Sequence, residues 1–85
     1  MKVILDGLTI STKEDFYLAV RQQLDLPDYF GDNLDALNDF IEERGELPVI
    51  TIYHYTGLRH ALGLDYLNRL FTMLTDCQCE IHILS

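Results

Sequence analysis

The chain has 85 residues, of which 48% are apolar, and its formal net charge at pH 7 is -8. This apolar content excludes an intrinsically disordered chain, and the length predicts one small domain, residues 1–85. The sequence has no apolar run long enough to cross a membrane. An acidic surface disfavours direct binding to nucleic acid, so a basic protein is the expected partner.

Compartment and redox state follow from the first residues and the cysteines. Residues 1–6 lack the apolar stretch and small-residue cleavage site of a signal peptide, so we expect a cytoplasmic protein. The two cysteines, Cys77 and Cys79, are one residue apart. A disulfide framework needs more cysteines that are more widely spread, and zinc sites use wider spacing and more ligands. We therefore expect reduced thiols, no metal and no cofactor.

The first half of the chain predicts one strand and one helix. Residues 3–5 form a short β-prone apolar run that is typical of a buried strand. Ser11 and Glu14 have the spacing of a capping box, so Ser11 is the predicted N-cap of a helix that runs to about Leu24. Pro27 prevents that helix from continuing.

A second helix is expected after the turn-rich loop at residues 26–33. Asn33 is its predicted cap and Gly45 its predicted C-terminal stop. The apolar residues Leu34, Leu37 and Ile41 recur at helical spacing and should face the core.

The remaining residues predict two strands and two helices. Residues 49–53 are strongly β-prone and residues 81–84 form a last strand, with a short helix at 56–62 between them. Asp65 is the predicted cap of a final helix, whose apolar stripe is Leu67, Leu70, Phe71 and Leu74. Strands separated by helices favour parallel pairing. The predicted fold is α/β: a three-stranded parallel β-sheet packed against three to four α-helices.

Negative charge is concentrated in one short segment. Between Asp25 and Glu46 there are eight acidic residues and a single basic residue, Arg44. Asp35, Asp39 and Glu42 are spaced i, i+4, i+7 and share one face of the second predicted helix. Such a face is either a solvated surface or a ridge that binds a basic partner.

Two aromatic residues adjoin this acidic face, in the loop before the helix. Exposed aromatic side chains beside charges are typical of binding anchors. We expect Phe30 to pack inward and Tyr29 to point outward.

Residues 26–39, Leu-Pro-Asp-Tyr-Phe-Gly-Asp-Asn-Leu-Asp-Ala-Leu-Asn-Asp, resemble the signature of the barstar family of ribonuclease inhibitors. The similarity extends to the first strand, to residues 46–49 and to the Ile-Leu-Ser ending. The resemblance implies a barstar-like fold. It also implies a proteinaceous inhibitor, not an enzyme, that binds a basic ribonuclease of the barnase type one to one.

The resemblance further implies which residues bind the partner. Asp39 would occupy the position of a substrate phosphate, Asp35 would pair with another basic group, and Tyr29 would pack on the catalytic histidine. The full predicted partner-binding set is Tyr29, Gly31, Asn33, Leu34, Asp35, Asn38, Asp39 and Glu42. A cis Leu47–Pro48 peptide bond, as in the best-known member, is also implied.

Three positions depart from the family pattern. Asn38 and Arg44 stand where tryptophans are found, and Thr72 stands where a partner-contacting glutamate is found, with Asp76 one helical turn further on. These differences favour a partner other than barnase itself. Two alternatives stay open: a barstar-fold module that binds a basic protein other than a nuclease, and an enzyme with Asp35 and Asp39 as its acid and base.

Overall fold

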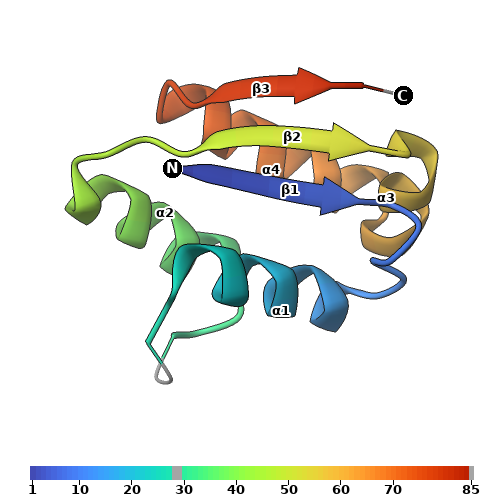
Figure 1. The fold of residues 1–85 in the computed structure, drawn as a ribbon, viewed down its shortest axis with the longest axis horizontal. Coiled ribbons are helices and arrows are strands. Elements are labelled where there is room, and N and C mark those ends of the chain that lie inside the picture. Colours follow the sequence, from blue (N-terminus) through green and yellow to red (C-terminus); the bar gives the residue numbers. More distant parts are fainter. Residues whose placement is uncertain (28–29, 85) are drawn as a thin grey trace.

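The computed structural model describes residues 1–27 and 30–84 (Figure 1). Within them the chain forms seven elements. In order these are β1 (Lys2–Asp6), α1 (Lys13–Leu24), α2 (Leu34–Arg44), β2 (Val49–Tyr53), α3 (Tyr55–Leu62), α4 (Leu64–Asp76) and β3 (Glu80–Ile83). The predicted α/β fold, with a three-stranded parallel sheet and helices, is confirmed. None of the described helices is long and apolar enough to cross a bilayer.

The sheet has the strand order β1-β2-β3, and both pairings are parallel. Val49 on β2 aligns with Lys2 on β1 and with Glu80 on β3. Successive side chains point to opposite faces of a sheet. Val3 and Leu5 on β1, with Ile50 and Ile52 on β2, are therefore on one face, where they are buried.

The helices lie on that one face. Figure 1 shows α4 behind the strands, α1 and α2 along the β1 side, and α3 at the carboxyl ends of β1 and β2. Each helix contributes buried apolar residues to the same core. These residues are Phe16, Val20 and Leu24 of α1, Leu34, Leu37 and Ile41 of α2, Leu58 and Leu62 of α3, and Leu67, Leu70 and Leu74 of α4. Phe71, which was predicted to belong to the stripe of α4, is only half-buried against that core.

Two predicted helix caps were wrong. The N-cap of α1 is Thr12, not Ser11: Thr12 Oγ1 accepts a hydrogen bond from the Asp15 amide at 3.1 Å, and Asp15 Oδ2 accepts one from the Ser11 amide at 3.0 Å. The Asp15 carboxylate thus bonds to the amide of the residue before the N-cap, and not to that of Thr12 as in a capping box. Asp65 lies inside the first turn of α4, which starts directly after Gly63.

None of the described peptide bonds is cis, and the Leu47–Pro48 bond is therefore trans. The sequence left the state of this bond open, and the cis form suggested by the family resemblance is not found here. Pro48 is buried, and the next residue, Val49, donates its amide to the Met1 carbonyl at 2.7 Å. This hydrogen bond joins the start of β2 to the residue before β1.

Candidate partner-binding surface

The sequence of α2 fixes which side of the helix faces solvent. Its apolar stripe is buried, so the residues on the other side must be exposed. Asp35, Asp39 and Glu42 are all exposed, as predicted, and we refer to these three residues as the acidic ridge. Among the described residues, no ion pair involves any of the three carboxylates.

The two ends of α2 are fixed by local chemistry. Asn33 Oδ1 accepts a hydrogen bond from the Ala36 amide at 2.8 Å, which confirms Asn33 as the N-cap. Gly45 ends the helix with a φ of 72°, a left-handed conformation that favours glycine. Asn33 and Gly45 therefore determine where α2 begins and ends, and with it the position of the acidic ridge.

The loop before α2 is tied to α1. Arg21 Nη2 donates to Asp32 Oδ2 at 2.8 Å, and Phe30 packs against the core with its ring 6.4 Å from that of Tyr17. The prediction that Phe30 points inward is thus confirmed. Gly31 lies close to the cap, since a Cβ added to it would be 3.1 Å from Asn33 Nδ2. Tyr29, predicted to point outward, lies outside the described residues.

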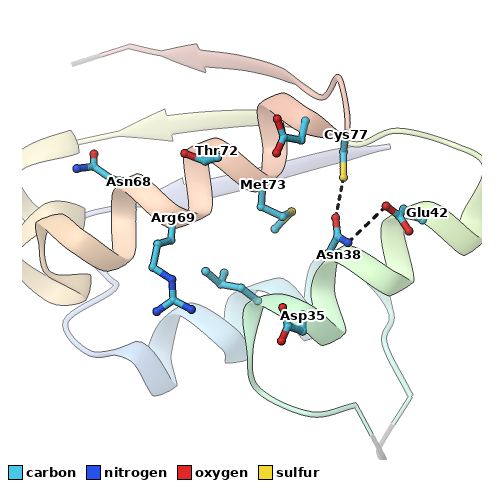
Figure 2. Close-up of a pocket in the computed structure, with 10 residues that line it drawn as sticks. Asp35, Asn38, Glu42, Asn68, Arg69, Thr72, Met73 and Cys77 are labelled. Carbon is cyan, nitrogen blue, oxygen red and sulfur yellow. Dashed lines mark hydrogen bonds between the residues drawn. The ribbon is translucent and has the colours of Figure 1, made fainter.

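A cleft of about 550 Å³ separates α2 from α4 (Figure 2). Asp35, Asn38 and Glu42 line its α2 side. Its other lining residues are Leu34 on α2 and Asn68, Arg69, Thr72, Met73, Asp76 and Cys77 on or next to α4. Three acidic side chains and one basic side chain therefore face this space.

A chain of hydrogen bonds crosses one end of the cleft. The Cys77 thiol donates to Asn38 Oδ1 at 3.0 Å, and Asn38 Nδ2 donates to Glu42 Oε1 at 3.4 Å (Figure 2). Burial raises the pKa of the Cys77 thiol, and the nearby charges of Glu42 and Asp76 raise it further. A raised pKa keeps the thiol protonated, as its role of donor requires.

Asp39 does not line that cleft. It borders a separate hollow of about 230 Å³ on the other side of α2, together with Pro27, Phe30, Gly31, Ala36, Phe40 and Glu43. Asp35 and Asp39, which the sequence places four residues apart on one helix face, thus border different depressions. This arrangement does not favour the alternative in which they form a catalytic acid–base pair.

Arg44, the one basic residue of the acidic segment, folds back toward α1. Its Nη1 donates to the Leu24 carbonyl at 3.3 Å, and its guanidinium lies 5.1 Å from the centre of the Phe40 ring. The contact with the end of α1 restrains this positive charge.

Sequence reasoning missed the contribution of Asn68, Arg69 and Cys77 to the cleft. Thr72 and Asp76, which it did single out, both line it. The available signal was the polar residues at helical spacing on the side of α4 opposite its apolar stripe. Among the described residues, no group of three or more His, Cys, Asp or Glu side chains is arranged to hold a metal ion.

Comparison with known proteins agrees with this architecture. The family model described as "Barstar (barnase inhibitor)" matches residues 1–82. The protein named "Putative ribonuclease inhibitor YrdF" from Bacillus subtilis (strain 168) is 28% identical over 80 residues, which are 94% of this chain and 88% of that protein. Since the family model covers nearly the whole sequence, the chain belongs to the barstar family.

Proposed function

We propose that the protein inhibits a basic ribonuclease by covering its active site with α2 and the loop before it. Membership of a family of inhibitors, and the name of the relative, support an inhibitory rather than an enzymatic role. In this proposal the Asp39 carboxylate takes the position of an RNA phosphate. The observation that carries it is that Asp39 is exposed on a well-anchored helix and forms no hydrogen bond or ion pair with the described residues.

An unpaired carboxylate suits this role for an energetic reason. The active site of a ribonuclease must be basic and concave to hold phosphates, and arginine makes short, charge-assisted hydrogen bonds to carboxylates. A carboxylate already neutralised inside its own molecule would lose that internal pairing on binding. Asp39 has no such described pairing to break.

The neighbouring residues extend the proposed surface. Asp35, one turn before Asp39, would pair with a second basic group, and Glu42 would add negative charge near the cleft. Gly31, Asn33 and Leu34 would approach the ribonuclease closely at the start of α2, with Tyr29 on the catalytic histidine. Asn38 offers an amide where the family pattern has a tryptophan, so the contacts at this point should differ from those made to barnase.

The test is a titration of the Asp39→Ala and Asp39→Asn variants against barnase and against any basic ribonuclease that co-purifies with the protein. Glu14→Ala, an exposed acid on α1, is the control. Truncating one partner of a desolvated interfacial charge pair, an effect for which barnase and barstar are themselves the reference case, costs about 2–5 kcal/mol. Both Asp39 variants should lose that affinity while the control keeps it. Unchanged affinity and inhibition in the Asp39 variants would contradict the mechanism.

The same experiment addresses the alternative of a module that binds a basic protein other than a nuclease. RNA cleavage is measured in the presence of saturating inhibitor. Loss of cleavage supports occlusion of an active site. Capture of a basic protein without any effect on cleavage supports the module.

A further inference from the structure

One face of the sheet is left uncovered. In the described chain α1, α2 and α4 lie on the other side of the sheet, and α3 lies at the carboxyl ends of β1 and β2 (Figure 1). Purely parallel sheets are nearly always covered on both faces, so an uncovered one is unusual. We refer to the uncovered side as the open face. Its residues are Lys2, Ile4, Asp6, Val49, Thr51, Tyr53, Glu80, His82 and Leu84. Asp6 Oδ1, at the end of β1, lies 3.5 Å from His54 Nδ1.

The open face exposes apolar side chains. Ile4 on β1 is 44% exposed, Tyr53 on β2 is 37% exposed, and Leu84, after β3, is 56% exposed. A shallow depression of about 670 Å³ runs across the three strands and includes Val49 and Thr51 at its centre. Burial of these groups against another surface would be favourable.

Two opposite charges of the open face, Lys2 and Glu80, are placed so that they complement each other about a two-fold axis. Lys2 on β1 and Glu80 on β3 are on the two edge strands, at the same level, on either side of Val49. Glu80 Oε2 also lies 2.7 Å from His82 Nε2 on its own strand, so Lys2 of a second copy would share this carboxylate with His82. Rotation by 180° about an axis along β2 exchanges the two edge strands. A second copy placed over the open face in this way would bring its Glu80 opposite Lys2, and its Lys2 opposite Glu80.

We propose that a second copy of this chain packs against the open face, about a two-fold axis along β2. The two sheets would form an aligned sandwich, with Thr51 facing Thr51 and Ile4 facing His82 of the other copy. The acidic ridge is on the helical side of each molecule, so the dimer would expose two ridges. The proposal stands independently of the target of the ridge.

The size of the open face predicts weak association. Ordinary strand spacing and rise give it a width of about 14 Å and a length of about 17 Å. A standard stable interface buries about 800 Å² on each partner, and this face is smaller. Each copy also carries a charge of -8, whose repulsion is screened at physiological salt. We therefore expect monomers at low concentration and a weak dimer whose fraction rises with concentration, as for other small interfaces.

The test is sedimentation equilibrium at about 0.15 M salt. The parent mass should rise with concentration from 9.9 kDa toward twice that value. Lys2→Glu and Glu80→Lys should each remain monomeric, because like charges then face each other. An equimolar mixture of these two variants should associate again, because all four charges of the mixed pair are complementary.

Two charge-matched variants outside the open face serve as controls. Arg59→Glu on α3 changes the net charge as Lys2→Glu does, and Glu14→Lys on α1 changes it as Glu80→Lys does. Both should dimerise like the parent, with only a small change in the dimerisation constant caused by the changed net charge. A parent that stays monomeric throughout, or a dimer that persists in either open-face variant, would overturn the proposal. Circular dichroism of each variant establishes that it is folded.

Discussion

The thiol of Cys77, just beyond the end of α4, donates a hydrogen bond of 3.0 Å to the side-chain oxygen of Asn38 on α2. The amide of Asn38 in turn donates to Glu42. Asn38 therefore links α2 to the end of α4. This link restrains one side of the proposed ribonuclease-binding surface.

Removal of the thiol should weaken this link. Cys77→Ala is expected to lower the free energy of unfolding by about 0.5–1.5 kcal/mol, the usual net value of one hydrogen bond. Cys77→Ser keeps an O–H donor at the same position, so it should lose less. Urea unfolding at pH 7 in a reducing buffer measures both values. Equal losses in the two variants would show that the hydrogen bond contributes nothing measurable.

The reactivity of Cys77 should depend on its acidic neighbours. Burial raises the pKa of this thiol, and Glu42 and then Asp76 raise it further, so alkylation at pH 8 should be slower than for an exposed cysteine. Glu42→Gln removes a negative charge and should speed the reaction, while Glu14→Gln on α1 should not. Mass spectrometry after timed exposure to iodoacetamide separates Cys77 from the buried Cys79. The same rate in parent and Glu42→Gln would exclude this electrostatic effect.

Local sequence signals predicted most of the fold. Residues 49–53 formed the predicted strand, and Asn33 and Gly45 ended α2 where expected, because strand propensity and helix caps depend on nearby residues. The N-cap of α1 was missed because Ser11 and Thr12 are adjacent and each is followed by an acid three residues later. Hydrogen-bond geometry, which a pattern does not contain, decides between them.

The candidate site was less predictable, because it depends on packing between distant segments. Helical spacing placed Asp35 and Asp39 on the solvent side of α2, which is confirmed. Helical spacing could not show where α4 packs against α2. Because of this packing, Asp35 borders the cleft between the two helices and Asp39 does not. The contact between Cys77 and Asn38 joins residues 39 positions apart, which no local pattern reveals.

The cap of α2 should contribute to stability as well as to the surface. Asn33→Ala removes the acceptor for the Ala36 amide and should destabilise the protein by about 1 kcal/mol. Asn33→Asp keeps an acceptor and places a negative charge at the helix N-terminus, where the dipole favours it, so it should retain stability. Thermal unfolding of the two variants beside the parent gives the comparison. A loss in Asn33→Asp as large as in Asn33→Ala would contradict the capping role.

The acidic ridge should accelerate encounter with a basic ribonuclease. Long-range attraction raises association rates and is screened by salt. Asp35→Asn combined with Glu42→Gln should therefore lower the association rate and flatten its dependence on salt between about 0.02 and 0.5 M. Stopped-flow measurements with the parent and this double variant give the slope of the association rate against salt concentration for each protein. Identical slopes would show that the ridge does not steer the partner.

Stability should fall in alkaline solution because of Tyr17. Burial raises its pKa above the ordinary value of 10.0, and so does its hydrogen bond with the Tyr66 hydroxyl. The folded protein therefore holds this proton more tightly than the unfolded chain, so the stabilising contribution is complete below pH 10.0 and is lost as the pH rises beyond it. Tyr17→Phe removes the titrating group. Urea unfolding of parent and variant between about pH 8 and pH 12 should show the parent's advantage shrinking above its unfolded pKa, and a constant difference would contradict the assignment.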